Sequence, residues 1–288
     1  MHVHTDRSGM CTVPVLRRFC RESYSEPLSV YALLKQRGMD LVTVTDHDSI
    51  EAAECLRKFP DFFLSEEVSC VTPAGSDIHV GVYDITERDH SVIQRRRNDL
   101  PSLIRYLDEH NLFFAVNHVF SSLTGARAEA DFALFQQHFP GVETLNGQIA
   151  AVLQPGGRQT GCTMGKGGRG GSDAHTLSSL GRTYTAVRGA QSKAEFLQGL
   201  KYRRTRTLGT SGSYAQLTLA VLSIGCSLVR DGRWGFLAAP LALAVPAMTL
   251  ASCLRDLLFA SRWSRKLNLR DLTRQAGNGI QLSTQEDT

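Results

Sequence analysis

The chain has 288 residues, of which 42% are hydrophobic and 21% are charged, and its formal net charge at pH 7 is +4. This composition excludes a mainly disordered chain, and the length allows one large α/β domain or two smaller ones. The weak positive charge, without interleaved aromatic and basic residues, gives no strong signal for nucleic acid.

The seven cysteines include no C-x-x-C pair, and their number is odd. A disulfide framework or a thiolate zinc site is therefore not expected, and reduced thiols in a cytoplasm are the simpler interpretation. The first residues are polar and carry histidines, so they do not predict a signal peptide.

Predicted strands and helices alternate along the first part of the chain. Residues 27–38 predict a helix closed by Gly38, residues 41–45 a β-branched strand, and Ser49 is a plausible N-cap of a second helix. This alternation favours an α/β domain with a largely parallel sheet or barrel, whose chemistry lies at the carboxyl ends of the strands. Further strands are predicted at 61–70, 76–85, 111–120 and 141–147, and further helices at 97–110 and 128–138.

Histidines and carboxylates stand near the ends of these strands. His2 and His4 alternate along an extended segment, so both side chains share one face and can reach one ion. Nitrogen and oxygen ligands without thiolate suit zinc, manganese or iron, and a bridging carboxylate can hold two ions about 3.5–4 Å apart. The other candidate ligands are His47, Glu67, His79, His118, Asp173 and His175.

Each of these elements alone also has a simpler interpretation. An H-x-H pair is often an exposed pair on a strand, and T-D-H-D is often a turn or a helix N-cap. For His79, a partly buried histidine that binds no metal is almost as good an interpretation as a metal ligand. Only one of Glu66 and Glu67 can point into a site from a strand. Three histidines beside charged helical stretches are predicted to be solvated: His90, His110 and His138.

Residues 156–171 are rich in glycine and are predicted to form a flexible loop. They contain a literal G-x-G-x-x-G at 165–170, but no strand leads into it and S-D-A-H follows instead of a helix. We therefore reject a dinucleotide site. The segment also fails the phosphate-loop pattern, because only three residues separate Gly161 from Gly165.

The composition changes near residue 207. Residues 207–229 and 236–254 carry no charge, and each is long enough for a membrane span of roughly 20 apolar residues. Basic residues flank both outer ends, which favours a hairpin through 210–255 with both ends in the cytoplasm. The alternative is a pair of buried helices in a soluble protein. Pro240 and Pro246 do not exclude a span.

The order of the motifs resembles that of the PHP (polymerase and histidinol phosphatase) family. The chain has HVHT, TDHD, SEEVS, NHVF and GSDAH in that order, and the resemblance covers residues 1–210. It implies a distorted (β/α)7 TIM-like barrel with two or three divalent metal ions. It also implies a phosphoesterase that hydrolyses a phosphate mono- or diester of a small molecule or nucleotide-like substrate through a metal-activated water.

The resemblance also implies roles for individual residues. One metal would be held by His2, His4, Glu67 and Asp173, and a second by Glu67 and His118 with His79 nearby. His47 and His175 would serve a third metal or contact phosphate. Catalytic roles are implied for Glu67 as the bridging carboxylate, for Asp173, and for Arg182, which either faces a substrate phosphate or is a surface arginine.

The chain departs from the family pattern in three places. The family has a strand before H-x-H, whereas this sequence starts at Met1, so the first strand is expected to be truncated. Gly9 stands where relatives carry a metal-binding aspartate, which puts the third metal in doubt. The segment between L-N-G and G-S-D-A-H is glycine-rich where relatives have a helix.

We therefore expect a PHP-like hydrolase domain at 1–209, a hydrophobic helical hairpin at 210–260 and a polar tail at 261–288. The domain is expected in the cytoplasm, attached to the inner membrane by the hairpin. Two other readings stay open: an amidohydrolase-type reaction at a carbon centre, and a non-catalytic PHP-like module tethered to a membrane.

Overall fold

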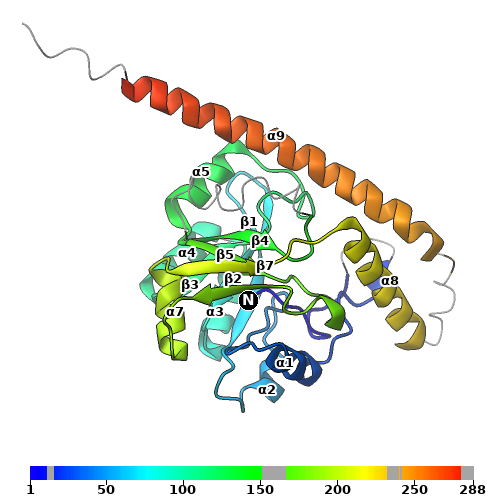
Figure 1. The fold of residues 1–288 in the computed structure, drawn as a ribbon. Helices are drawn as coiled ribbons and strands as arrows, with labels where there is room; N and C mark the ends of the chain where they lie inside the picture. The colour runs from blue at the N-terminus through cyan, green and yellow to red at the C-terminus, as the bar shows by residue number, and fades with distance from the viewer. Residues whose placement is uncertain (12–15, 151–166, 232–239, 241, 280–288) are drawn as a thin grey trace, which may run out of the picture.

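The computed structural model describes residues 1–11, 16–150, 167–231, 240 and 242–279. Its main sheet has the strand order β1-β2-β3-β4-β5 (Figure 1). β1 pairs with β2 and β2 with β3 in antiparallel fashion, while the pairs β3/β4 and β4/β5 are parallel. The strands span Ser65–Val71, Asp77–Tyr83, Phe113–Val116, Gly141–Asn146 and Gly167–Gly171.

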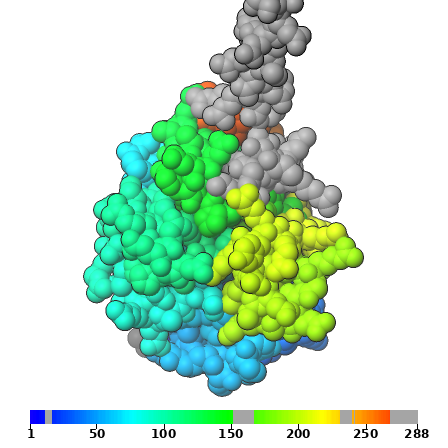
Figure 2. All heavy atoms as spheres, turned by 90° about the vertical axis from the view of Figure 1, so that its left-hand side faces the viewer, coloured from blue at the N-terminus to red at the C-terminus, as the bar shows by residue number. Residues whose placement is uncertain are grey.

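A second, two-stranded sheet consists of β6 (Thr183–Val187) and β7 (Thr205–Gly209), which are antiparallel. It packs against β5, and the space-filling view shows the yellow-green part of the chain directly against the green part (Figure 2). The fold is therefore mixed α/β, as expected. Within the described residues, however, the strands do not close into a barrel.

The antiparallel half of the sheet departs from the largely parallel arrangement that we expected. β1 and β2 form a hairpin whose connection needs a left-handed residue, and Gly75 supplies it with a φ of +80°. The expected strand at 41–45 is extended and buried but forms only isolated bridges, such as the parallel bridge from Val42 to Phe62.

Helices cover the sheet between these strands. The helix that we expected to begin after Ser49 is shorter in the structure, where α2 spans Ala53–Leu56. The Ser49 hydroxyl accepts a hydrogen bond from the amide of Glu51 and stabilises a local turn before the helix. The other helices of the α/β part are η1 (Leu16–Arg18), α1 (Pro27–Gln36), α3 (Glu87–Arg96), α4 (Leu100–Glu109), α5 (Glu129–His138), η3 (Leu177–Ser179) and α7 (Lys193–Lys201).

The main hydrophobic core lies between the sheet and α3, α4 and α5. α4 carries the clearest amphipathic pattern, and its Leu103 and Leu107 are fully buried in one core with Phe114 and Val116 of β3. Trp263 from the C-terminal helix belongs to the same core. The core therefore fixes β1 to β4, whose polar ends carry the candidate ligands.

The glycine run that we expected to be a loop contains a strand. Residues 151–166 lie outside the described residues, but Gly167–Gly171 form β5 beside β4. Glycine is required here by close packing. A Cβ at Gly168 would lie 2.9 Å from Thr144 Oγ1, and one at Gly171 would lie 2.2 Å from the Cβ of His2. The sequence analysis interpreted these glycines as a sign of a flexible loop, whereas they allow the backbone of β5 to pack closely against Thr144 and His2.

The C-terminal region holds α8 (Tyr214–Asp231) and α9 (Val245–Gly279), which contact each other. Among the described helices, the segment Ala242–Leu267 is long and apolar enough to cross a membrane, judged by length and composition. The α8 segment is apolar but shorter. Figure 1 shows α9 crossing the top of the molecule beside α5. One of the two expected spans thus meets the length criterion.

Candidate metal centre

Glu67 of β1 lies at the centre of a cluster of histidines. Its carboxylate is buried, and Oε2 lies 3.0 Å from His2 Nε2, 3.2 Å from His4 Nε2 and 3.6 Å from His47 Nε2. These rings come from the N-terminal segment and from the turn after residues 41–45. One carboxylate oxygen therefore faces three imidazole nitrogens.

The other oxygen of Glu67 faces a second pair of histidines. Oε1 lies 3.5 Å from His79 Nδ1 and 3.4 Å from His118 Nε2, and these two nitrogens are 3.3 Å apart. His79 stands on β2 and His118 directly follows Asn117 at the end of β3. Glu67 thus has the position expected of a carboxylate that bridges two ion sites.

Asp173 faces the H-x-H pair from the opposite side. Its Oδ1 lies 3.3 Å from His2 Nε2 and 3.4 Å from His4 Nε2, while Oδ2 accepts a hydrogen bond from Asn146 Nδ2 at 3.0 Å. The backbone of Asp173 has a φ of +49°, a left-handed conformation that asparagine and aspartate tolerate better than most residues.

Backbone pairing holds these residues in register. The amide of Asp173 donates to the carbonyl of His2 at 2.7 Å, and the amide of His4 donates to the carbonyl of Ala174 at 3.0 Å. A parallel bridge likewise joins His47 to Glu67. Motifs that are far apart in sequence are therefore neighbours in the fold, and this explains why their ligand atoms converge.

Glu143 is part of the site, and sequence reasoning missed it. On β4 it is buried, and its Oε1 lies 2.8 Å from His2 Nδ1 while its Oε2 accepts the amide of His118 at 2.9 Å. A carboxylate can only accept there, so Nδ1 of His2 carries the proton and Nε2 is left for an ion. The signal available in the sequence was a glutamate on a predicted strand, G-V-E-T-L-N-G.

Glu22 is the second acidic residue that sequence reasoning missed. Its Oε2 lies 3.4 Å from His47 Nε2, and its Oε1 lies 3.3 Å from His175 Nε2. The amide of Glu22 donates to the carbonyl of Gly9 at 3.1 Å, so Glu22 lies beside the position where we noted a missing aspartate. No motif spacing marked it, because the sequence between Gly9 and Glu22 has no regular pattern.

A buried arginine behind Glu67 was also missed. Arg169 of β5 is fully buried, and its guanidinium donates to the side-chain oxygen of Asn117 and to the hydroxyl of Tyr83. Asn117 in turn donates from Nδ2 to Glu67 Oε1. This chain of hydrogen bonds supports the Glu67 carboxylate from the interior of the fold and adds a positive charge behind it.

The charges of the cluster stabilise one another. Burial disfavours the charged forms, but the neighbouring histidines outweigh it and hold the pKa values of Glu67, Glu22 and Asp173 well below their usual range. The carboxylates of Asp173, Glu67 and Glu143 raise the pKa of His2 well above its usual value despite burial. At His79, burial is the dominant cause and lowers the pKa.

The residues fit divalent metal ions. Nε2 of His4 is buried and has no hydrogen-bond partner within the described chain, although it faces the oxygens of Glu67 and Asp173. An ion would satisfy these atoms. Ligand atoms within 4.8 Å of one another occur in four groups: His2, Glu67 and His118; His2, His4 and Asp173; His4, Glu22 and His47; and His47, Glu67 and His79.

The histidines of the cluster differ in their exposure to solvent. The side chains of His47, His79 and His175 are 17%, 20% and 21% exposed, whereas those of His2 and His4 are fully buried. A substrate would therefore approach past the partly exposed rings.

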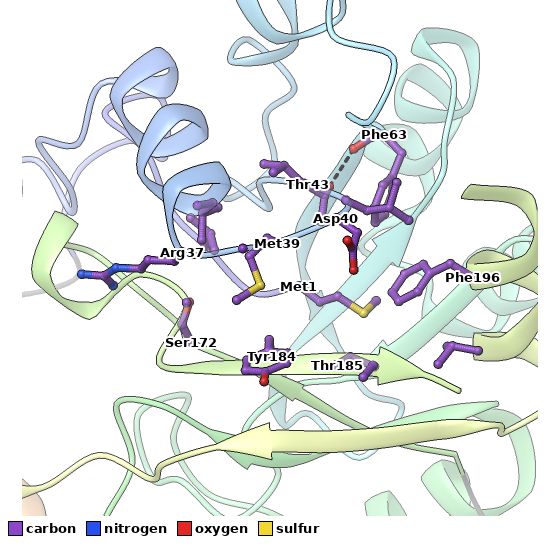
Figure 3. A pocket seen from close by; sticks show the side chains of 18 of the residues that line it. Met1, Arg37, Met39, Asp40, Thr43, Phe63, Ser172, Tyr184, Thr185 and Phe196 are labelled. Carbon is purple, nitrogen blue, oxygen red and sulfur yellow. Dashed lines mark hydrogen bonds between the residues drawn. The ribbon is translucent and has the colours of Figure 1, made fainter. Parts of the chain in front are cut away.

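Arg182 is not brought to this cluster by any contact that we observe among the described residues. Its side chain is exposed, and its Nε donates to the carbonyl of Ser178 at 3.2 Å. It lines a separate cavity of about 810 Å³ beside Met1, which Met39 and Phe196 also line (Figure 3). The expectation that Arg182 faces a substrate phosphate stays a prediction.

Glu66 and His90 lie on the other face of β1. The ring nitrogen Nδ1 of His90 is 2.9 Å from Glu66 Oε2, and Gln94 donates to the same oxygen at 2.8 Å. In the structure, therefore, only one of the two adjacent glutamates enters the site. The expectation that His90 is simply solvated was wrong, because its side chain is only 21% exposed and pairs with Glu66.

Comparison with protein families agrees with this geometry. The family model PHP_C, described as PHP-associated, matches residues 163–205, which include β5, Asp173 and His175. This match agrees with the resemblance to the PHP family that the order of the motifs indicates. No curated protein matches the chain in sequence.

Solved structures resemble this chain over 70% of its length. PsfC from Pseudomonas syringae PB-5123 shares the fold, with a TM-score of 0.53 at 16% identity, covering 70% of this chain and 88% of PsfC. A proposed metal-dependent phosphoesterase from Bifidobacterium adolescentis aligns with a TM-score of 0.40 at 12% identity, covering 70% and 94%. The lesion-specific endonuclease PfuEndoQ from Pyrococcus furiosus gives 0.45 at 13%, covering 70% and 55%.

Proposed function

We propose that this protein is a metal-dependent phosphoesterase that hydrolyses a phosphate mono- or diester. The observation that carries the proposal is the buried carboxylate of Glu67, each of whose oxygens faces a different set of imidazole nitrogens. A bridging carboxylate between two nitrogen-rich sites suits a pair of closely spaced divalent ions.

Three sets of side chains would hold the ions. His2, His4, Asp173 and Glu67 would hold the first, and Glu67, His118 and His79 the second. The third set is His47, His175 and Glu22. Zinc, manganese and iron all suit these ligands. When bound, such ions bring the pKa of water near 7 and neutralise phosphate oxygens.

The protein contributes the orientation of the ligands. Nδ1 of His175 lies 2.9 Å from the carbonyl of Asp173, which can only accept, so this nitrogen carries the proton and Nε2 faces the site. Nδ1 of His4 is held by the hydroxyl of Ser8 at 2.9 Å. Together with the bond from His2 to Glu143, these contacts aim three Nε2 atoms inward before an ion arrives.

We propose a phosphorylated small molecule or a nucleotide-like compound as the substrate. Where no third ion is bound, the partly exposed rings of His47 and His175 can instead contact a phosphate group, because their carboxylate partners raise their pKa values despite burial. Such rings donate hydrogen bonds to anions.

The test combines metal analysis with two generic substrates. Protein purified without chelator should contain at least two divalent ions per chain and should hydrolyse p-nitrophenyl phosphate or its diester. Glu67→Gln should abolish this activity, while Glu66→Gln, the matched change on the other face of β1, should keep most of it.

Other outcomes would favour the other readings. Bound metal without hydrolysis of either ester, combined with cleavage of amide substrates, would support an amidohydrolase. Protein that binds neither metal nor phosphate esters would support a non-catalytic module. Equal losses in the Glu67→Gln and Glu66→Gln variants would contradict the bridging role of Glu67.

A further inference from the structure

Helix α9 has two faces with different environments. Its inner face is bound to the α/β part of the molecule: Asp256 is 6% exposed and accepts the amide of Ser122 at 2.8 Å. Further along, Trp263 is 4% exposed and its ring centroid lies 4.7 Å from that of Phe132 of α5. The helix is therefore anchored to the α/β part by a buried carboxylate and a buried aromatic ring.

The outer face of α9 is apolar and exposed. Leu258 is 72% exposed, and Leu243 in the turn that leads into α9 is 88% exposed, far more than is usual for leucine in a soluble helix. Between them the helix carries Met248, Leu250 and Leu254, which are 48–53% exposed. Among the described residues, nothing covers this stripe, and its length along the helix makes it a surface rather than a scattering of single residues.

The charges on α9 are distributed unequally between the two faces. In residues 242–267 the sole acidic residue is Asp256, which is buried on the inner face. Arg255, Arg262 and Arg265 are all exposed. The surface that this part of α9 offers to the outside is therefore apolar and cationic, without a negative charge. This combination is complementary to a lipid bilayer with anionic headgroups.

We propose that the outer face of α9 docks in the plane of an anionic membrane surface while its inner face stays on the α/β part. Leu250, Leu254 and Leu258 would enter the boundary between headgroups and acyl chains, and the arginines would contact lipid phosphates. The proposal does not depend on the reaction proposed above.

This mode of binding differs from the spanning hairpin that composition suggests. A span would have to pull Asp256 away from Ser121 and Ser122 and Trp263 away from Phe132. It would then place an unpaired carboxylate next to Arg255 within the hydrocarbon, where ionised side chains are strongly disfavoured. Docking along the surface keeps every one of these contacts.

The experiment is flotation of the full chain with vesicles. Protein should float with phosphatidylcholine vesicles that contain phosphatidylglycerol and should bind vesicles of phosphatidylcholine alone about tenfold more weakly, because the anionic headgroups attract the arginines. Binding should weaken as salt is raised. Bound protein should be released by an alkaline carbonate wash, and retention after the wash would overturn the proposal in favour of a span.

Variants make the test specific to this face. Leu258→Glu should weaken vesicle binding about tenfold or more, because it places a charge on the apolar stripe. Leu28→Glu, which changes a 37% exposed leucine on α1, should leave binding unchanged. Arg262→Gln with Arg265→Gln, a milder change to the same helix, should weaken binding to anionic vesicles. Metal content and circular dichroism show that the variants fold.

Two results would contradict the proposal. Unchanged flotation of both the Leu258 and the arginine variants would show that another surface binds lipid. A dimer of the free protein that dissociates in the Leu258→Glu variant, without any vesicle binding by the original protein, would show that the face instead binds a second copy of the chain.

Discussion

Glu66 and Glu67 are neighbours on β1 and have opposite environments: Glu67 faces five histidines, whereas Glu66 contacts His90 at 2.9 Å on the far side of the sheet. The alternation of side chains along a strand produces this separation. Two carboxylates of the same type, one residue apart, thus offer a matched pair for testing the metal centre.

Replacing Glu67 with Gln should remove at least one divalent ion per chain, because the amide cannot bridge two ions as a carboxylate does. The measurement is elemental analysis of protein purified without chelator. Glu66→Gln should retain the metal content of the original protein, since its carboxylate pairs with His90 and Gln94 on the other face. Loss of metal in both variants to the same extent would refute the assignment.

Replacing Glu22 should weaken the binding of one ion and leave the binding of the others unchanged. Glu22→Gln removes the carboxylate that lies 3.3 Å from His175 and 3.4 Å from His47, so the metal content should fall by at most one ion per chain. Glu51→Gln, an exposed change in the turn before α2, is the control. A Glu22 variant with unchanged metal content under limiting metal would show that Glu22 is not a ligand.

Metal binding should release protons near pH 7. The pKa values of His2, His4, His47 and His175 are raised in the metal-free protein, because their carboxylate partners outweigh burial. A metal needs the neutral ring, so protons compete with it below these raised values, and affinity should fall as the pH is lowered through them.

Isothermal titration in buffers of different ionisation enthalpy counts these protons. Heat that depends on the buffer at pH 7 and less so at higher pH is the expected result. His79, whose pKa is lowered by burial, should contribute no proton. Heats that are equal in all buffers at pH 7 would mean that the rings are already neutral before metal binds.

Gly171→Ala should disturb both stability and the site. The new methyl group would lie 2.2 Å from the Cβ of His2 and 2.9 Å from Glu143 Oε1, so the backbone must shift. Overpacking of this kind costs about 1–3 kcal/mol of unfolding free energy. Urea denaturation measures the loss, and metal content should fall with it. Gly225→Ala in α8, where nothing lies within 4 Å, should be neutral or stabilising.

Asp256→Ala should destabilise the α/β part although Asp256 lies on the C-terminal helix. The change leaves the buried donors of Ser121 and Ser122 without their acceptor, which costs about 1–3 kcal/mol. Because the amide of Ser121 donates to the carbonyl of His118, metal affinity should also fall. Arg255→Ala, the exposed neighbour, is the control, and equal stability of the two variants would contradict the coupling.

The candidate ligands could be predicted because histidine and carboxylate side chains are common metal ligands and stand in recognisable sequence motifs. His2 and His4 alternate on an extended segment, and the structure places both rings on Glu67. Glu22 and Glu143 were not predictable in the same way. Each enters the site through long-range pairing, Glu22 beside Gly9 and Glu143 opposite His2, and a single sequence contains no local pattern for such contacts.

The sequence predicted the α/β fold class correctly, but it did not predict that the strands of the described residues leave the sheet open instead of closing it into a barrel. Local patterns revealed most strands of the main sheet, because buried strands are rich in apolar and β-branched residues. β5 was not predicted, because glycine-rich sequence does not favour a strand. Its glycines are needed because Thr144 and His2 leave no space for larger side chains. Residues 41–45 have a strand-like sequence, but their pairing depends on neighbours that only the tertiary structure defines.

The docking of α9 on the α/β part bears on how the protein can be prepared. Hydrophobic tails are commonly trimmed to obtain material that stays in solution, and the sequence invites a cut near Thr207. Here such a cut would remove the packing of Trp263 on Phe132 and the hydrogen bond between Asp256 and the loop after His118. It would also expose apolar core side chains to water. We expect the shortened chain to aggregate more than the full one, so detergent or lipid is the better route to an intact sample.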